Sequence, residues 1–341
     1  CEQWVRTIQA AGLKGVILTA KHHDGFCLWQ TATTEYSVKN SPWEDGKGDM
    51  VKELSDACHK HGLKFGIYLS PWDRNSENYG QPGYVEKFHA QLHELVCNYG
   101  PLFEYWFDGA NGGNGWYGGA DETRSIDPNS YYKYEQAVDT IKKYNPSVMI
   151  FGGTEPTIRW IGNEEGWAGD TQWSMFTKKD GIHYRQSQWG LEDGEQWLGG
   201  ECDVSIRPGW FYHREEDDKV KSLSTLVDIY FKSVGYNSVL LLNIPPDTRG
   251  LIHENDAKRL QELAQYISHT FATDYGKTSH EKITGKEGDS FEINITATTP
   301  VNTLLLQEDI QNGQRIEAFT VEASINGVWE KISEGTTIGY K

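Results

Sequence analysis

The feature that most constrains this fold is a repeated alternation of short apolar runs and amphipathic segments. The runs are typical of strands buried on both faces, and they occur at Gly15–Ala20, Lys64–Ser70, Leu102–Phe107, Val148–Gly152, Ser238–Asn243 and, more weakly, Asp203–Ile206. Between them apolar residues recur at helical spacing, within 51–61, 85–99, 220–234 and 260–267. Strand–helix alternation of this length predicts a parallel sheet covered by helices.

Two parallel architectures fit this alternation, a closed barrel and a doubly wound sheet. The first apolar run is followed by Lys21-His22-His23-Asp24-Gly25 and not by a glycine-rich phosphate loop, which disfavours a nucleotide-binding sheet. Polar and aromatic residues follow several predicted strands, where a barrel places its active site. We therefore predict an α/β fold, a TIM-like (β/α) barrel, over residues 1–270.

The pattern changes near residue 270. Alternating segments at Ser290–Ala297, Thr303–Gln307 and Ala318–Ala323 predict strands of a small C-terminal β-sandwich over residues 271–341, here incomplete. Before this boundary, Glu155–Gly200 is an irregular stretch rich in glycine and tryptophan. It is too long for a plain connection, which indicates a functional loop.

Charge and composition narrow the classes of ligand. The chain has 32 Lys and Arg against 49 Asp and Glu, a net charge of −17, which disfavours nucleic acid as a partner. A neutral sugar meets no such repulsion, and the 13 tryptophans could stack on sugar rings or simply fill the core. No apolar run reaches the roughly 18 residues of a membrane span. The five cysteines form no CxxC pair, so we predict no metal site.

Two strand-end segments carry groups suited to chemistry. Asp108 follows the run Leu102–Phe107, and a carboxylate at the carboxyl end of a barrel strand lies in the reaction chamber. The plainer interpretation of Asp108 is a turn or cap residue before Gly109. His22 and His23 follow the first run; adjacent histidines on a strand end are expected to point in different directions. One of them could contact a ligand while the other lies in the core.

Two further segments hold weaker candidates. Glu164 and Glu165 are adjacent acids on the long loop, where carboxylates are usually solvated. One of them could donate a proton if an aromatic wall such as Trp160 desolvated it. Trp210, after Pro208-Gly209, could either stack on a sugar or pack against the adjoining helix.

Taken together, these segments resemble glycoside hydrolase family 29, the retaining α-L-fucosidases, over about residues 1–270. Lys21–Phe26 resembles the family's His-His-Asp-Gly segment, and Trp106–Gly109 resembles its nucleophile strand. Arg159–Glu164 and Asp203–His213 resemble the branch selective for α-1,3 and α-1,4 fucose. The family's first barrel strand, with another sugar-binding histidine, would precede residue 1, so we expect this chain to be part of a longer protein.

The resemblance implies a role for each matching residue. Asp108 would be the nucleophile and Glu164 the acid/base, with Glu165 and then Glu201 as alternatives to Glu164. The sugar would be held by His22, His23, Tyr68, Trp106 and Trp210. A retaining glycosidase needs two carboxyl groups about 5–5.5 Å apart and no cofactor.

The expected function is hydrolysis of terminal α-1,3- or α-1,4-linked fucose from Lewis-type glycans. A fucosylated oligosaccharide or glycoconjugate would be the partner. We expect a secreted or periplasmic protein, although no signal peptide is visible. Three alternatives stay open: a fucosidase of broad or α-1,2 specificity, a glycosidase acting on another sugar, and a barrel that binds fucose without cleaving it.

Overall fold

The structure is a computed structural model that describes residues 1–177, 184–276, 284–295, 297 and 299–340. Its centre is a curved sheet of seven parallel strands: β1 (Gly15–Lys21), β2 (Lys64–Leu69), β3 (Glu104–Trp106), β6 (Met149–Phe151), β7 (Ile158–Trp160), β10 (Gly199–Ser205) and β11 (Ser238–Asn243). The strands lie side by side in the order in which the chain forms them. A doubly wound sheet reverses that order at a switch point, so the predicted barrel architecture is confirmed.

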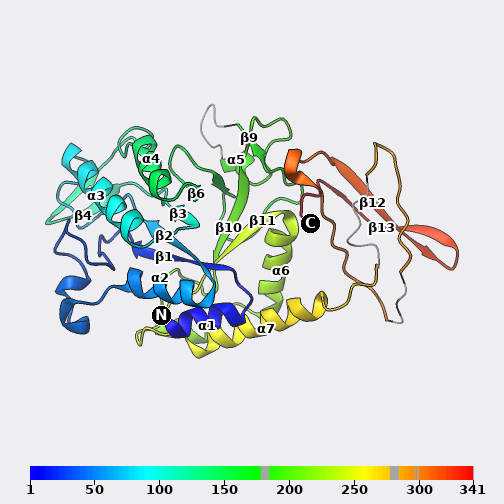
Figure 1. Ribbon diagram of the computed structural model, residues 1–341, viewed down its shortest axis with the longest axis horizontal. Helices are drawn as coiled ribbons and strands as arrows, with labels where there is room; N and C mark the ends of the chain where they lie inside the picture. The colour runs from blue at the N-terminus through cyan, green and yellow to red at the C-terminus, as the bar shows by residue number, and fades with distance from the viewer. Residues whose placement is uncertain (178–183, 277–283, 296, 298, 341) are drawn as a thin grey trace.

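Helices cover the outside of the curved sheet (Figure 1). They are α1 (Glu2–Ala10), α2 (Met50–His61), α3 (Pro82–Asn98), α4 (Tyr134–Tyr144), α5 (Tyr184–Ser187), α6 (Leu223–Ser233) and α7 (Glu254–Thr270). Short 3₁₀ turns lie at Val38–Asn40, Trp43–Gly46, Arg214–Lys219, Val234–Tyr236 and Ile310–Asn312. In the described part of the chain, no helix is both long and apolar enough to cross a membrane.

Local sequence signals explain where these helices begin and end, and α2 is a clear case. The Asp49 side chain accepts a hydrogen bond from the Lys52 backbone N–H at 2.9 Å, which satisfies one donor of the first turn. At the other end Gly62 has φ +71°, a conformation that glycine adopts at little cost. Between them Val51, Leu54 and Cys58 form the buried face.

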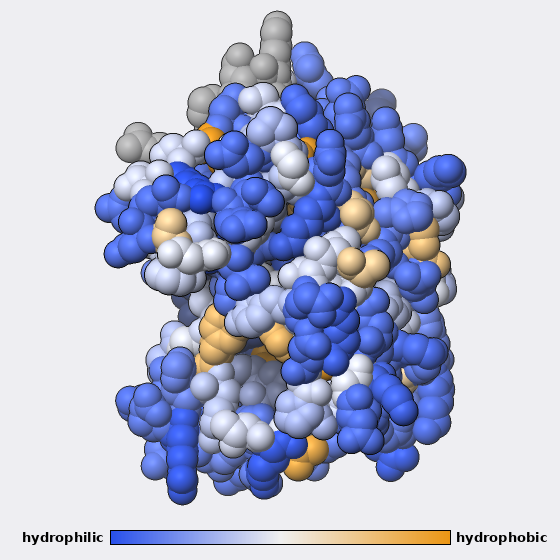
Figure 2. All heavy atoms as spheres, turned by 90° about the vertical axis from the view of Figure 1, so that its left-hand side faces the viewer, coloured by the Kyte–Doolittle hydropathy of each residue, from blue (hydrophilic) through white to orange (hydrophobic). Residues whose placement is uncertain are grey.

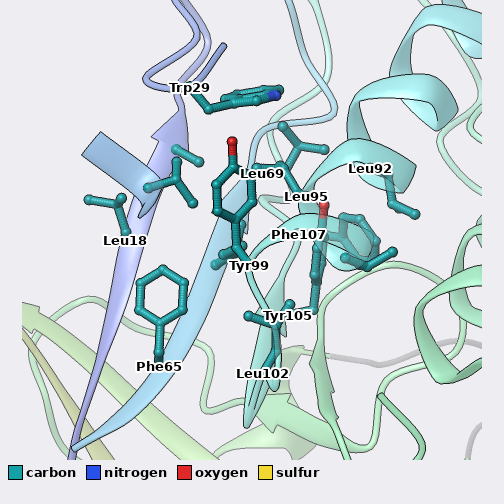
Figure 3. Close-up of a cluster of buried hydrophobic side chains, with 14 of the residues drawn as sticks. Leu18, Trp29, Phe65, Leu69, Leu92, Leu95, Tyr99, Leu102, Tyr105 and Phe107 are labelled. Carbon is teal, nitrogen blue, oxygen red and sulfur yellow. The ribbon is translucent and has the colours of Figure 1, made fainter. Parts of the chain in front are cut away.

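The side chains of each strand alternate between two cores. Tyr105 and Phe107 point outward, where they join Leu18, Phe65 and other apolar side chains packed under α3 (Figure 3). The residues that alternate with these along each strand point into the barrel. There they form a second cluster, which contains Tyr68, Trp106, Phe151 and Ile158. The barrel interior is therefore filled by side chains, and the strand ends lie above this packed floor.

The long stretch Glu155–Gly200 is more regular than the sequence indicates. It contributes a strand of the barrel, β7, as well as the small antiparallel pair β8 (Met175–Phe176) and β9 (Gln196–Trp197). The sequence analysis missed β7 because its three residues, Ile158, Arg159 and Trp160, give no apolar run. The Arg159 side chain is fully buried and donates to backbone carbonyls such as Ser187 O at 2.8 Å.

The C-terminal region corrects two predicted strands. Ser290–Ala297 and Thr303–Gln307 contain no strand among their described residues, because alternation stabilises a strand only where a partner pairs with it. The predicted strand at Ala318–Ala323 is confirmed as β12 (Ala318–Ile325), paired with β13 (Val328–Thr336). This hairpin lies at the far end of the molecule from α3 (Figure 1), and its turn is the dipeptide Asn326-Gly327, a strong hairpin signal.

Surface hydropathy and cavities are two features that can indicate a site. The face shown in Figure 2 is mainly hydrophilic and carries only small, separate apolar patches. A cavity of about 430 Å³ lies between α1 and α7, lined by residues such as Ala10, Ala257 and Gln261. None of the predicted site residues lines it, so cavity volume does not locate the chemistry in this chain.

Candidate active site

The predicted nucleophile is held at the carboxyl end of β3 by two hydrogen bonds. Asp108 lies two residues beyond the strand. Its Oδ1 accepts from the Ala110 backbone N–H at 2.8 Å, and its Oδ2 accepts from the Tyr68 hydroxyl at 2.8 Å. Burial first, and then the charge of Asp108, raise the pKa of Tyr68 well above its usual range, so this hydroxyl keeps its proton and donates. Asp108 therefore has a fixed orientation.

His22, His23 and Asp108 converge, and this corrects the expectation that the histidines point apart. Each of the three residues has one atom that could coordinate a metal, a ring nitrogen or a carboxylate oxygen, and these three atoms lie within 4.8 Å of one another. The two imidazole centroids are 3.9 Å apart. Strand β1 ends at Lys21, so the alternation of side chains no longer applies. The chain turns instead at Gly25, whose φ is +84°. A Cβ there would lie 2.2 Å from Asp73 Oδ1, so the turn requires glycine.

The hydrogen bonds around His23 assign its tautomer. Ser70 Oγ donates to the Trp72 carbonyl at 2.8 Å, so it accepts from His23 Nδ1, which lies 2.7 Å away. Burial first, and then His22, lower the pKa of His23 to about 4, so the ring is neutral. Its Nε2 is then an acceptor, and it lies 3.8 Å from Asp108 Oδ2. A hydroxyl group bound between them could donate to either atom.

A second group of residues surrounds Glu164. The Trp210 indole N–H donates to Glu164 Oε2 at 3.3 Å, whereas Glu165 accepts from the Trp167 indole at 2.7 Å. The two adjacent acids thus point to different partners. Phe211, next to Trp210, packs edge-on against His22 with ring centroids 4.9 Å apart. The loop after β10 therefore connects the group around Glu164 to the group around Asp108.

The tryptophans of the long loop lie in different parts of the molecule. Trp160 belongs to β7 and donates to Asp203 Oδ1 at 2.7 Å, so its indole N–H does not go to Glu164. Trp173 is buried. Trp197 lines a separate cavity of about 260 Å³ with Gly199 and Ser238, the first residues of β10 and β11. That is the amino-terminal end of the barrel, so Trp197 lies away from the predicted site residues.

The structure also adds residues that the sequence analysis missed. Ser70 orients His23, and Phe211 covers His22. Neither position stands out by residue type. Ser70 is the last residue of one predicted strand and Phe211 lies in the segment after another, and this placement is the signal that could have found them. Inside the barrel, Asp203 is buried beneath the loop of Glu164. Burial is the main cause that raises the pKa of Asp203 to about 7.

The fold is a barrel with a cluster of polar and aromatic side chains at the strand ends, and comparison with known proteins identifies the class of enzyme. The alpha-L-fucosidase family matches residues 1–270. A structure of a glycoside hydrolase 29 family member from an unknown rumen bacterium is 48% identical, with a TM-score of 0.92 over 100% of this chain and 63% of that chain. A Ruminococcus gnavus GH29 fucosidase in complex with fucose is 31% identical, with a TM-score of 0.81 over 99% of this chain and 78% of that one.

The chain belongs to the alpha-L-fucosidase family, glycoside hydrolase family 29. Among curated proteins, putative alpha-L-fucosidase 1 of Oryza sativa subsp. japonica is 40% identical over 99% of this chain and 69% of the rice protein. The predicted resemblance and enzyme class are therefore confirmed at the level of the family. The chain spans about three fifths of the rumen bacterial structure and about seven tenths of the rice protein.

Proposed function

We propose that this protein is a retaining exo-α-L-fucosidase with Asp108 as nucleophile and Glu164 as acid/base. The observation that carries the proposal is the fixed carboxylate of Asp108, with both oxygens hydrogen-bonded and a neutral imidazole acceptor 3.8 Å away. This arrangement suits a group that attacks one carbon while its neighbours hold sugar hydroxyls. Family membership and the fucose-bound relative support fucose as that sugar.

The proposed cycle has two displacements. Asp108 attacks the anomeric carbon while Glu164 protonates the leaving oxygen, which gives a fucosyl ester of Asp108. Glu164 then takes a proton from water, the water attacks the same carbon, and the ester bond breaks. His22 and His23 bind hydroxyls of the sugar, with His23 Nε2 as an acceptor. Trp106 and Trp210 provide apolar contact for the ring.

The convergence of His22, His23 and Asp108 would also suit a metal ion, but we assign these groups to the sugar. Ser70 fixes the tautomer of His23. Tyr68 donates to Asp108 Oδ2, which is the carboxylate oxygen that faces His23. Each step of the proposed cycle uses only carboxyl groups and water. We also propose a location outside the cytoplasm, supported by the human relative named plasma alpha-L-fucosidase, which is 38% identical over 78% of this chain.

A panel of aryl glycosides tests the activity. We expect release of the aryl group from the α-L-fucoside and not from matched α- or β-galactosides, glucosides or xylosides, because the proposed pocket is assigned to fucose. Initial rates followed by absorbance at several enzyme concentrations are the measurement. Binding of fucose without any turnover would instead support the non-catalytic alternative, and preferential cleavage of another sugar would reject fucose.

The linkage is the finer part of the proposal. We propose preference for α-1,3- and α-1,4-linked fucose on branched glycans, on the basis of the likeness at Arg159–Glu164 and Asp203–His213. The exposed indole of Trp167 contacts Glu165, which is adjacent to the proposed acid/base Glu164, so we assign Trp167 to the leaving sugar. Binding of a second sugar can help to orient the reacting bond.

We therefore expect kcat/KM for a Lewis-type trisaccharide to exceed that for an α-1,2 fucosyl disaccharide by about tenfold or more, the effect of about 1.4 kcal/mol of extra binding. The aryl fucoside should also be the poorer substrate. Trp167→Ala should reduce this preference, whereas Trp197→Ala, at the other end of the barrel, should leave it unchanged. Equal or better use of the α-1,2 disaccharide would reject the linkage and leave the fucosidase activity standing.

A further inference from the structure

The barrel interior contains a pair of buried carboxyl groups that the proposed catalytic cycle does not use. Glu104 on β3 is 3% exposed and Glu201 on β10 is 1% exposed. Glu104 and Trp106 are two residues apart on one strand, so both side chains face into the barrel. Acidic side chains are almost never fully buried unless they are paired, so this pair requires a physical explanation.

A single shared proton explains how the pair is tolerated. Two ionised carboxylates would repel each other, and Glu104 Oε1 and Glu201 Oε2 would lack a donor within the described part of the chain. Burial first, and then the charge of Glu201, raise the pKa of Glu104 to about 10. Burial also raises the pKa of Glu201, to about 7. At a pH above the pKa of Glu201 and below the pKa of Glu104, the pair therefore keeps one proton, which supplies the missing donor between the two groups.

A chain of contacts connects this pair to the predicted nucleophile. Glu201 Oε1 accepts from the Trp106 indole N–H at 3.0 Å in the buried interior. The Trp106 ring stacks on Phe151 at 4.0 Å and on Tyr68 at 5.1 Å between ring centroids. The Tyr68 hydroxyl then donates to Asp108 Oδ2 at 2.8 Å.

The Trp106 indole N–H has no other hydrogen-bond partner among the described residues, so Glu201 is the polar contact that holds the indole, in addition to its stacking on Phe151 and Tyr68. The rings of Trp106 and Tyr68 are inclined by 23°, so a tilt of one ring displaces the other. A change beneath Trp106 therefore has a path of direct contacts to Asp108, through the ring and the hydroxyl of Tyr68.

We propose that Glu104 and Glu201 form a one-proton carboxyl pair that positions Trp106 and, through Tyr68, the carboxylate of Asp108. The inference rests on the proposed function, because it assigns Asp108 to the reaction. Neither glutamate touches the sugar. Glu201 acts as the acceptor for Trp106, and Glu104 provides the proton that allows Glu201 to remain buried as an acceptor.

The alternative is that the pair has only a structural role. A buried polar pair with that role can often be replaced by apolar residues of similar size without loss of stability. The two roles therefore separate in a double variant, Glu104→Met with Glu201→Met, because methionine is unbranched and adapts to irregular space. The double variant Glu104→Gln with Glu201→Gln keeps a donor and an acceptor in the same places. Tyr105→Phe, on the outward face of the same strand, is the matched control.

We expect the methionine pair to fold with an unchanged or higher melting temperature and to lose about 10- to 100-fold in kcat, the range expected for a misplaced reacting group. The glutamine pair and Tyr105→Phe should stay within about twofold of the original kcat. A stable methionine pair with the original kcat would overturn the positioning role. Loss of kcat in the glutamine pair equal to that of the methionine pair would overturn it as well.

Infrared spectroscopy tests the shared proton without relying on activity. At about pH 9, where Asp203 and Glu201 are ionised and Glu104 keeps its proton, the unaltered protein should show the C=O stretch of a protonated carboxyl group, sensitive to deuterium exchange, and Glu104→Gln should remove it. Absence of this band, or an unchanged band in Glu104→Gln, would overturn the one-proton pair even if the methionine variant does not fold. An unaltered protein without fucosidase activity would reject the proposed function, and the infrared result would still decide the state of the pair.

Discussion

Replacement of Asp108 by asparagine is expected to lower kcat on an aryl α-L-fucoside by at least about a thousandfold, since an amide cannot replace a carboxylate nucleophile. The fold should persist. An asparagine oxygen can still accept the 2.8 Å hydrogen bond from either Tyr68 or the Ala110 backbone, and Asp108 lies outside both hydrophobic cores. Steady-state kinetics with a thermal melt of each variant is the measurement.

Asp121→Asn provides the matched control for this loss. Asp121 is an exposed acid on β5 (Ala120–Arg124), which pairs with β4 (Gly113–Tyr117) in the hairpin that follows Asp108 along the chain. Its replacement changes the net charge by the same amount, so it should leave kcat unchanged. Retention of more than about a tenth of the activity by Asp108→Asn would argue against Asp108 as the nucleophile.

Glu164→Ala is expected to lower the rate on substrates with poor leaving groups by about 10²- to 10⁴-fold, the usual contribution of a general acid. Activated aryl fucosides should lose far less in the first displacement, because their leaving groups need little protonation. Azide should partly restore turnover on these activated substrates, since it attacks the fucosyl ester without a general base. Kinetics across a series of aryl leaving groups gives the comparison.

Glu165→Ala is the control that the chain itself offers. The two acids are adjacent and both exposed, but Glu165 accepts from Trp167 while Glu164 accepts from Trp210 in the loop that reaches His22. Glu165→Ala should therefore keep the original dependence on the leaving group. The opposite result, with the dependence and the azide rescue in Glu165→Ala alone, would transfer the acid/base role to Glu165.

The barrel could be predicted because most of its strands give continuous apolar runs. Five of the seven barrel strands coincide with such runs, and β2, within Lys64–Ser70, is buried at every position after the first. The sixth, β10, was predicted only weakly, because its inward side chains include Glu201 and Asp203. The seventh, β7, carries a buried arginine and was missed. The two strands that hydrophobicity alone does not predict, β7 and β10, thus both carry buried polar side chains. These side chains form hydrogen bonds with residues far away in the sequence.

The candidate site was predictable in residue type and position along the chain but not in its contacts. Asp108 and His22 stand out because each follows a strand, and strand ends meet at one end of a barrel. The tautomer of His23 depends on Ser70, 47 positions away in the chain. The proposed pairing of Glu104 with Glu201 would join strands that are far apart in the sequence. Such contacts follow from closure of the sheet, so no local pattern contains them.

Trapping of the covalent intermediate tests the central claim most directly. A slow fluorinated fucosyl substrate should form an ester with the nucleophile that breaks down slowly enough to be isolated. After proteolysis, mass spectrometry should find the fucosyl label on the peptide that contains Trp106–Gly109, with fragmentation placing it on Asp108. Label on another carboxylate, such as Glu164 or Glu201, would contradict the assignment of Asp108 as the nucleophile.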